Sequence, residues 1–561
     1  MSGASHNDLE TFDYVIVGAG PSAMGILYCL LESHVDTDED VSGLPFSIAV
    51  IERGEGPPHD TSTQSPHRWY EAAYSRNSTS VRLYPSSIMG RRVDIPVGQG
   101  LGGTSNINAC LCLPPLEEDM ERWPDPWKHS LVDSARYLLK VLESNGALQY
   151  GEDDLTSNNN PFYSSMGLTG AVPTMASKDT ATGGSFVREN YYSGLVAPFL
   201  QRYPRFQNSI TWFRGVEAQR LITNGTNVIG VECLNLQQNN DSMFTLRATK
   251  RTILCAGAIE TPALLLVSSP GADQRLSGIG KKLKDQALLA RAHLRKTAQD
   301  TSAEQSVSGI AALGHWKHAT YGLFQLALAD FVSLPSILPR VAAMPIRWKC
   351  SSKCLTHILN FCAEMIQFAS ELAICYTPLG FVLKRWVLVS MVFLMHPRSD
   401  GTVTIHPKNI HRMKTLRRRD VEVEVDPGYL QDDQDFDALS AAWEDLQSQS
   451  TTSFLEVFPK PLLLLLRFIL PQHVCFQTIF CRFFLQPYYH FAGTCAMSND
   501  GRDTKNDADW VVESSTLRLR GYDGRYICDA SVFPSMISNP PALTCASLGY
   551  QFGKMIVVAD H

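Results

Sequence analysis

The sequence predicts an α/β fold, α+β overall, on three observations. Residues 12–32 run from a short apolar, β-rich stretch through glycines into an apolar helical pattern, which is the order strand, tight turn, helix. Residues 47–54, SIAVIERG, form a second buried strand that ends in an acid and completes a βαβ unit. A series of short alternating strands follows from about residue 205, with Asn224 and Gly225 as a hairpin signal.

Composition narrows the class of protein. The chain has 561 residues, of which 44% are hydrophobic and 19% charged, so it can bury a large core. At roughly 100–200 residues per domain, this length suggests three domains or two closely joined ones. The net charge is −7 and no basic run is long enough to follow phosphates, so nucleic acid is not an expected partner. The 14 cysteines fall mostly in apolar runs, so we expect reduced thiols and no metal site.

The first motif joins the first strand to the first helix. Gly18, Gly20 and Ala23 form the pattern G-x-G-x-x-A. The first glycine permits a tight turn, the second lets a pyrophosphate approach the backbone, and the small third residue lets helix and strand pack closely. Glu52 ends the next strand, where its carboxylate can accept hydrogen bonds from an adenosine ribose and would repel the 2′-phosphate of NADP. These residues predict a dinucleotide site for either FAD or NAD.

Four further motifs follow along the chain. The segment 98–108, GQGLGGTSNIN, is too polar for a core strand and too rich in glycine for a helix, so it suits close approach to a ligand. The segment 256–262, AGAIETP, is a turn into a helix that we expect to begin near Thr261 and Pro262. The last two motifs are QPYYHFAGTC at 486–495 and CDASVFPSMISNPPALT at 528–544.

In this order and at these spacings, the five motifs resemble those of the glucose-methanol-choline (GMC) family of flavoprotein oxidoreductases over essentially the whole chain. The resemblance implies a Rossmann-like FAD-binding domain built from separate segments. It also implies an inserted substrate domain on an antiparallel β-sheet with helices, similar to that of p-hydroxybenzoate hydroxylase. Residues 1–125, 195–290 and 488–561 would form the FAD domain, and residues 126–194 and 291–487 the substrate domain.

The resemblance further implies how the cofactor is held. Members that attach FAD covalently carry a histidine where this chain has Ile107, so we expect FAD to bind without a covalent link. The chain departs from the family pattern at Gln99, where a basic residue is usual, and at Lys284-Asp285-Gln286, where a histidine is usual. The residues expected around FAD are Gly18, Gly20, Ala23, Glu52, Gly102, Gly103, Thr104, Asn108, Val216, Ala256, Asp529, Ala530 and Pro540.

The expected chemistry is oxidation of an alcohol, which needs a base for the hydroxyl proton and an acceptor for the hydride. Histidine suits the base because its ordinary pKa of about 6.5 leaves it largely neutral near pH 7. The resemblance assigns this role to His490, with Asn539 as a partner whose amide can donate to the developing alkoxide. This fold also hosts lyases, isomerases and a light-driven decarboxylase, so chemistry without net oxidation stays open. The electron acceptor, oxygen or a quinone, also stays open.

The segments assigned to substrate binding are rich in Leu, Phe and Ile and nearly free of acids. An apolar period of 3.6 predicts an amphipathic helix over 355–375, and 386–395 and 401–407 are predicted strands of a second sheet. Residues 55 to about 100 show little period and are expected to be irregular. A sugar site would need more polar residues, so we expect a lipid, sterol, terpenoid or polyketide-like alcohol as the substrate.

The sequence also bears on location. The N-terminus carries acids where a signal peptide needs basic residues, and no stretch gives about 20 uncharged apolar residues. We therefore expect neither secretion nor a membrane span. The apolar segments have Lys and Arg nearby, so the expected protein is cytoplasmic, either free or in peripheral contact with a membrane.

Overall fold

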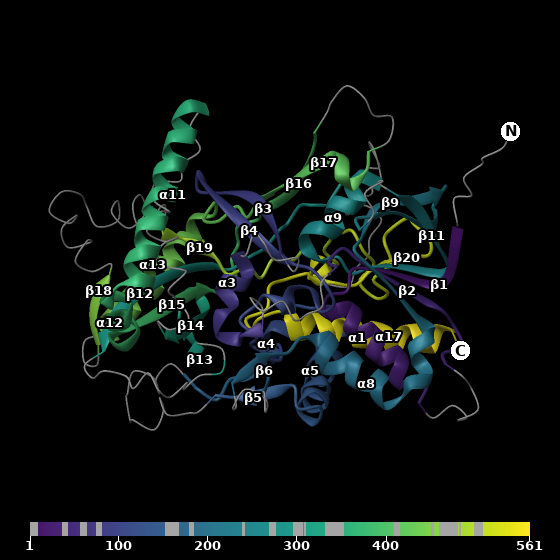
Figure 1. Cartoon of the computed structure of the whole chain (residues 1–561), viewed down its shortest axis with the longest axis horizontal. Coiled ribbons are helices and arrows are strands. Elements are labelled where there is room, and N and C mark those ends of the chain that lie inside the picture. Colours follow the sequence, from purple (N-terminus) through teal and green to yellow (C-terminus); the bar gives the residue numbers. More distant parts are fainter. Residues whose placement is uncertain are drawn as a thin grey trace.

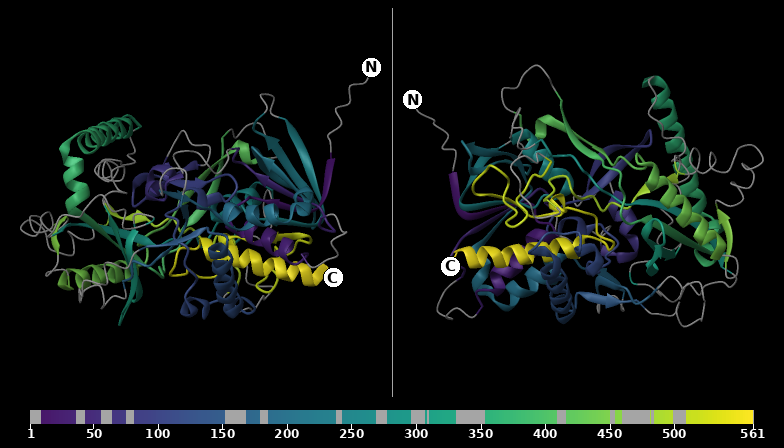
Figure 2. Two further views of the ribbon diagram at one scale, coloured as in Figure 1. Left: turned by 60° about the horizontal axis from the view of Figure 1, so that its bottom comes forward. Right: turned by 180° about the vertical axis from the view of Figure 1, so that it is seen from behind.

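The computed structural model arranges the residues that it describes in four β-sheets and the helices around them. The residues that it describes are 9–35, 43–55, 64–74, 81–151, 168–178, 185–237, 242–268, 277–295, 307, 310–330, 353–408, 416–449, 454–458, 481, 484–498 and 509–560. Residues 331–352 and 459–480, which hold much of the apolar sequence expected to bind the substrate, lie outside these residues. Figures 1 and 2 show that the first and second sheets lie toward opposite ends of the molecule.

The first sheet has seven strands, in the order β8-β2-β1-β11-β10-β9 with β20 against β11. β1 lies parallel to both β2 and β11, which confirms the predicted βαβ unit. The predicted hairpin at Asn224 and Gly225 joins the antiparallel strands β9 and β10. The strands are Leu9–Val17 (β1), Ile48–Glu52 (β2), Ile210–Arg214 (β8), Val216–Asn224 (β9), Asn227–Asn235 (β10), Met243–Leu254 (β11) and Arg525–Ile527 (β20).

Apolar helices pack beside this sheet (Figure 1). α1 (Pro21–Glu32) is buried along most of its length and packs against α17 (Ala542–Asp560), which also contacts α5 (Trp127–Ser144). Within the described ranges, α17 is the one helix long and apolar enough to cross a membrane. Its apolar window is 61% buried inside the protein, which is typical of the core helix of a globular domain.

The second sheet has six antiparallel strands, in the order β13-β14-β15-β12-β18 with β19 against β12. One face packs against α13 (Asp433–Gln449), where Phe324, Leu439 and Trp443 are buried together. The opposite face carries a second apolar cluster. The strands are Ala287–Arg295 (β12), Ile310–His318 (β13), Gly322–Asp330 (β14), Val387–Leu394 (β15), Phe454–Phe458 (β18) and Gln486–Pro487 (β19).

A third sheet, in the order β16-β17-β3-β4, corrects two predictions. β3 (Val81–Ile88) and β4 (Arg91–Gly98) form a hairpin in the segment that was predicted to be irregular. Pro85 and Pro96 hide the strand pattern there, but proline is tolerated where a strand pairs little on one side, and β3 pairs with β17 (Val421–Asp426) at a single position. The predicted strands at 386–395 and 401–407 belong to different sheets, because β16 (Thr402–Pro407) pairs with β17.

The third sheet also combines residues 81–98 and 402–426, which the predicted domain boundaries place in different domains. The division into domains stays a prediction. The predicted helix over 355–375 is confirmed as α11 (Lys353–Tyr376), which projects beyond the second sheet in both figures. The remaining elements are α3 (Trp69–Tyr74), α4 (Glu117–Met120), β5 (Leu148–Tyr150), β6 (Pro173–Lys178), β7 (Phe186–Arg188), α8 (Ala197–Arg202), α9 (Gly257–Ser268), α11 (Lys353–Tyr376) and α12 (Pro378–Trp386).

The helix α9 begins at Gly257, so the predicted start near Thr261 is wrong. Pro262 lies inside the helix and leaves the carbonyl of Ala258 without its usual N–H donor. The hydroxyl of Thr494 donates to this carbonyl at 2.7 Å. A contact 236 residues away along the chain thus satisfies the helix, and local sequence patterns do not reveal such a contact.

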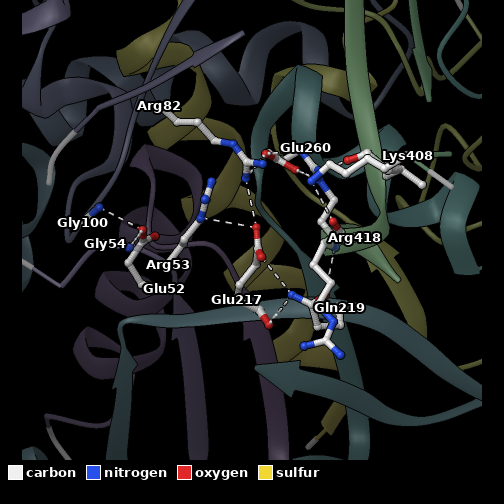
Figure 3. A network of polar contacts seen from close by, with 12 residues as sticks. Glu52, Arg53, Gly54, Arg82, Gly100, Glu217, Gln219, Glu260, Lys408 and Arg418 are labelled. Atoms are coloured by element: carbon white, nitrogen blue, oxygen red, sulfur yellow. Dashed lines mark hydrogen bonds and ion pairs between the residues drawn. The ribbon is translucent and has the colours of Figure 1, made fainter. Parts of the chain in front are cut away.

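Five charged residues join the first and third sheets (Figure 3). Arg82 Nη1 lies 3.0 Å from the carboxylates of both Glu217 and Glu260. Arg53 pairs with Glu217 at 3.3 Å, and Arg418 pairs with Glu260 at 2.6 Å. Burial alone would raise the pKa of Glu260, but Arg418 and Arg82 outweigh burial and lower that pKa to about 2. The charges of the cluster therefore persist throughout the physiological pH range.

We expect Arg418→Met to lower the free energy of unfolding by about 3 kcal/mol, the low end for breaking a buried ion pair, because Arg82 still faces Glu260. Arg518→Met is the matched control, since Arg518 pairs with Glu513 near the surface, where ion pairs contribute about 0–1 kcal/mol. Urea unfolding of both variants measures the difference. Equal unfolding midpoints would contradict a stabilising role for the buried cluster.

Candidate active site

A cavity of about 370 Å³ lies where the five sequence motifs meet the second sheet. Each motif contributes to its lining, although they are spread over more than five hundred residues of the chain. The lining residues from the motifs include Gly18, Gly20, Gly98, Gly103, Thr104, Asn108, Ala256, His490, Asp529, Ala530 and Pro540.

The two glycine-rich loops pack backbone against backbone at one part of the cavity. Gly18 has a φ of +99°, and a Cβ on it would lie 2.4 Å from a carbonyl oxygen just after β11. Gly103 has a φ of +55°, and its Cβ would lie 2.8 Å from the Cα of Gly20. The N–H of Gly102 donates to the carbonyl of Ala19 at 2.8 Å. A side chain at Gly103 would therefore push the two loops apart, and one at Gly18 would push the first loop away from the end of β11.

Glu52 ties the same loops together. Its carboxylate accepts hydrogen bonds from the backbone N–H groups of Ala19 at 3.0 Å, Gly54 at 2.8 Å and Gly100 at 2.9 Å. Burial raises the pKa of Glu52, and the three donors act in the opposite direction. Oε2 accepts one of these bonds and keeps a lone pair, and Glu52 lines the cavity. Glu52 can thus organise the loops and still accept a ribose hydroxyl.

The same part of the cavity fits the ADP half of FAD. The N-terminus of α1 opens beside it at Gly20, which has no side-chain cap, so the first N–H groups of the helix are available to a phosphate. The glycines allow a pyrophosphate to approach the backbone. Asp529 supports the neighbouring wall, because its carboxylate accepts hydrogen bonds from Gly257 N, Thr261 Oγ1 and Ser531 N at 2.6–2.9 Å.

His490 lies in a backbone turn that Asp285 holds. The carboxylate of Asp285 accepts hydrogen bonds from the backbone N–H groups of Tyr488, Tyr489 and His490 at 3.2, 3.2 and 2.7 Å. The hydroxyl of Tyr429 donates to the same carboxylate. Tyr489 has a φ of +66°, a conformation that a non-glycine residue rarely adopts and that these bonds stabilise. Burial raises the pKa of Asp285 to about 6.

Gln286 determines which nitrogen of His490 carries the proton. Its side-chain Nε2 donates to the backbone carbonyls of Ile537 at 2.8 Å and Met395 at 3.2 Å. The amide oxygen Oε1 is thereby directed at His490 Nδ1, 2.8 Å away. Because this oxygen can only accept, Nδ1 must be protonated and Nε2 must hold the lone pair. Burial lowers the pKa of His490 to about 3, so the ring is neutral at pH 7. His490 therefore has the form of a base.

A stack of rings and a chain of hydrogen bonds fix His490 from the side of the second sheet. The Tyr488 ring lies between the rings of His490 and Phe393, at centroid distances of 3.8 and 3.9 Å. The Tyr488 hydroxyl donates to Gln325 Oε1 at 2.7 Å, and Gln325 Nε2 donates to the carbonyl of Ser538 at 3.2 Å. The residue next to Ser538 is the predicted partner Asn539, so the chain of contacts connects the two predicted catalytic positions.

Asn539 is buried, with 4% of its surface exposed, and does not line the cavity. Its Nδ2 donates to the carbonyl of Pro114 at 2.7 Å, which fixes the orientation of the amide. Its Oδ1 is buried and has no hydrogen-bond partner among the described residues. The structure therefore places Asn539 behind the cavity wall.

The far wall of the cavity is the apolar face of the second sheet. Ala290 pairs across strands with Met391, and Ala292 pairs with Val389. The small side chains of these alanines leave space between the larger apolar side chains of the wall. The described residues of this wall include no carboxylate. The wall residues are Leu288, Ala290, Ala292, Ile310, Ala327, Val389, Met391 and Phe393.

Eleven of the fifteen predicted site residues line the cavity, and Ala23, Gly102, Val216 and Asn539 do not. Gly102 is nevertheless part of the loop contact, and Ala23 lies buried in α1. Sequence reasoning missed Tyr488 and Gln325, and it noted Asp285 and Gln286 only as departures from a family pattern. The departure from the family pattern at Asp285 and Gln286 was the signal that could have revealed their role, because both residues contact His490.

Comparison with known sequences identifies the family. The GMC oxidoreductase family matches residues 12–288 through its N-terminal part and residues 397–549 through its C-terminal part. The chain belongs to the GMC oxidoreductases. This is a family of FAD-dependent enzymes, and the glycine loops, the Glu52 lone pair and the open helix end fit that cofactor.

Related GMC oxidoreductases are distant in sequence but match along the whole chain. The oxygen-dependent choline dehydrogenase of Escherichia coli is 24% identical over 588 residues, covering 97% of this chain and 95% of the relative. Pyridoxine 4-oxidase from Mesorbium loti has a similar fold, with a TM-score of 0.66, 17% identity and coverage of 98% and 100%. Formate oxidase gives a TM-score of 0.67, 17% identity and 99% coverage of both chains.

We expect Gly103→Ala to abolish most FAD binding, because a Cβ there has no room beside Gly20. Gly146→Ala is the matched control: Gly146 also has a positive φ, +72°, but a Cβ on it meets nothing within 4 Å. Both variants carry a similar backbone strain, so the difference between them reports the loop contact. The ratio of flavin absorbance to protein absorbance measures binding. Equal flavin content in the two variants would show that the two glycine-rich loops can separate without loss of FAD binding.

We expect Gln286→Glu to raise the pKa of His490 from about 3 into the range above 6, because a carboxylate beside Nδ1 stabilises the charged ring. Gln286→Leu, which removes the amide without adding a charge, leaves the pKa low. Nitrogen-15 NMR of histidine-labelled holoenzyme measures both, with the His490 signal assigned by its loss in His490→Gln. Wild-type His490 stays neutral from pH 5 to 8. If the His490 ring of the wild-type protein titrated near pH 6.5, the conclusion that this ring is neutral at pH 7 would be refuted.

Proposed function

We propose that this GMC oxidoreductase binds FAD without a covalent link and oxidises the hydroxyl group of a hydrophobic alcohol to an aldehyde or ketone. The neutral Nε2 of His490 is the base that accepts the hydroxyl proton. The observation that carries this proposal is the tautomer fixed by Gln286, which leaves a lone pair on a ring that lines the cavity. A base with this geometry contributes about 10²–10⁴-fold to proton transfer.

The residues of the chain divide the remaining tasks. Glu52, Gly18, Gly20 and Gly103 hold the ADP half of FAD, and bound FAD supplies an acceptor for the hydride of the carbinol carbon. Asp285 and Gln286 hold the base in place. Asn539 keeps an unpaired amide oxygen behind the wall. We assign Asn539 a positioning role through Ser538, in place of the direct alkoxide contact expected from the sequence.

The cavity supports an apolar substrate of the lipid, sterol, terpenoid or polyketide-like class. Its far wall consists of Ala, Val, Ile, Leu, Met and Phe side chains on one sheet face. A substrate like choline carries a permanent cation, which favours a carboxylate or a cage of several aromatic rings. Among the described residues of this wall, Phe393 is the one aromatic side chain and there is no carboxylate. Desolvation of an apolar substrate against this face would contribute roughly 25 cal/mol per Å² buried.

The absence of a covalent link rests on Ile107. By the resemblance to the family, this residue stands where covalently flavinylated members carry histidine, and it lines the cavity with 3% of its surface exposed. An alkyl side chain has no nucleophilic atom to attach to a flavin. Denaturation should therefore release the entire flavin content into the supernatant.

The test is anaerobic addition of an apolar alcohol panel to the FAD-loaded enzyme, followed by flavin absorbance. We expect long-chain, terpenoid or sterol alcohols to reduce the flavin, and His490→Gln to slow that reduction by about 10²–10⁴-fold. His129→Gln, on the surface of α5, is the matched control and should react normally.

Three outcomes would count against the proposal. Bound flavin that no alcohol reduces would favour chemistry without net oxidation. Reduction by choline or sugars alone would refute the substrate class. A near-normal rate in His490→Gln would remove His490 as the base.

A further inference from the structure

The segment 538–542 forms one wall of the active-site cavity and carries the predicted partner Asn539. Residues 540–542 line the cavity, whereas Ser538 and Asn539 lie behind them, 0% and 4% exposed. The two prolines of the wall have no N–H group that could hold it in place. The contacts of Ser538 and Asn539 therefore fix the backbone of this wall.

One short stretch of the chain, residues 114–119, accepts hydrogen bonds from both of these residues. Asp119 Oδ2 accepts the backbone N–H of Ser538 at 2.8 Å, and Asp119 Oδ1 accepts the Ser538 hydroxyl at 2.7 Å. The backbone carbonyl of Pro114 accepts Nδ2 of Asn539 at 2.7 Å. Two consecutive residues thus make three hydrogen bonds to a stretch that lies more than four hundred residues earlier in the chain.

Asp119 is a buried carboxylate that has no task in the function proposed above. It belongs to α4, is 0% exposed and is not among the described residues that line the cavity. Without its carboxylate the buried N–H of Ser538 would lose its acceptor, which destabilises the position of the wall. The rings of Trp123 and Phe533, with centroids 4.9 Å apart, hold the chain after α4 in this region independently of Asp119.

The contacts of Ser538 continue to the base. Its carbonyl accepts a hydrogen bond from Gln325 Nε2 at 3.2 Å, and Gln325 Oε1 accepts the Tyr488 hydroxyl at 2.7 Å. The Tyr488 ring lies against the ring of His490, with centroids 3.8 Å apart. Displacement of Ser538 would therefore change the support of the His490 ring.

A second set of contacts to the base begins at the same carboxylate. His396 Nε2 lies 3.3 Å from both Asp119 Oδ1 and the hydroxyl oxygen of Ser538. The preceding residue, Met395, accepts a hydrogen bond through its carbonyl from the side chain of Gln286. Because Gln286 orients the base, Asp119 lies where two sets of contacts to the base meet.

We propose that Asp119 is a positioning residue of the active site. Through Ser538 it holds Asn539 behind the wall, and through the contacts described above it holds the ring of His490 beside the cavity. This role rests on the proposed function, because it takes His490 as the base. Asp119 contributes two acceptor oxygens, so a side chain that pairs with both groups of Ser538 should replace it.

Two substitutions at Asp119 test this role in the FAD-loaded enzyme. Asp119→Leu removes both acceptors, and we expect the limiting rate of flavin reduction by apolar alcohols to fall at least tenfold. The alcohol concentration that gives half of this rate should change less than twofold, because the apolar wall on the second sheet keeps its own contacts. Asp119→Asn should restore the rate to within twofold of the wild-type value, because its amide oxygen accepts the Ser538 N–H and its Nδ2 donates to the Ser538 hydroxyl oxygen.

Asp435→Leu is the matched control. Asp435 is 3% exposed and accepts the N–H and the hydroxyl of Ser399 at 2.8 and 2.6 Å, the same pattern in a place that does not line the cavity. This variant should lose stability to urea as Asp119→Leu does, but its flavin should be reduced at the wild-type rate. A tenfold rate loss in Asp435→Leu, or an equal loss in Asp119→Asn and Asp119→Leu, would overturn the proposal.

Nitrogen-15 NMR of asparagine-labelled holoenzyme measures the position of Asn539 without any substrate. The Asn539 side-chain signal, assigned by its loss in Asn539→Asp, should move or broaden in Asp119→Leu and stay in place in Asp119→Asn and Asp435→Leu. If no alcohol reduces the wild-type flavin, the proposed function fails, and this signal still decides whether Asp119 positions Asn539. A signal that is unchanged in Asp119→Leu would refute the positioning role.

Discussion

The structure depends on the backbone contact between the two glycine-rich loops and on the single carboxylate that joins them. Gly103 lies against Gly20, and Glu52 accepts N–H groups from Ala19, Gly54 and Gly100. A buried carboxylate with three donors is stable, whereas the same donors left unpaired would each cost about 1–3 kcal/mol. The two glycine-rich loops, the end of β2 and the start of α1 are therefore positioned together.

The sequence revealed the residues whose role is local. The G-x-G-x-x-A turn, the hairpin at Asn224 and the helix over 355–375 follow from spacing within one segment, and all three are confirmed. The hairpin of β3 and β4 was missed because both strands carry a proline, and the start of α9 was misplaced because the proline inside that helix depends on Thr494. Periodicity cannot indicate a hydrogen bond that another part of the chain supplies.

The candidate site shows the same division. His490 and the cavity-lining residues could be predicted because they stand in motifs, whereas the position of Asn539 behind the wall could not be. The residues that define the state of His490 are Asp285 and Gln286, which sequence comparison marked only as unusual. The orientation of Gln286 depends on the hydrogen bonds that its side-chain amide donates to the carbonyls of Ile537 and Met395. These three residues lie in segments more than a hundred residues apart along the chain.

The amide of Gln286 has a consequence for the proton inventory of the site. A histidine at this position could take up a proton from Nδ1 and relay it toward the protein interior, but an amide oxygen cannot. Under the proposed function, the proton that His490 accepts would have to leave from Nε2, on the side of the ring that received it. A catalytic cycle would then end only after the product has moved away and water or another acceptor has reached that nitrogen, so entry of water into an apolar cavity would be part of turnover.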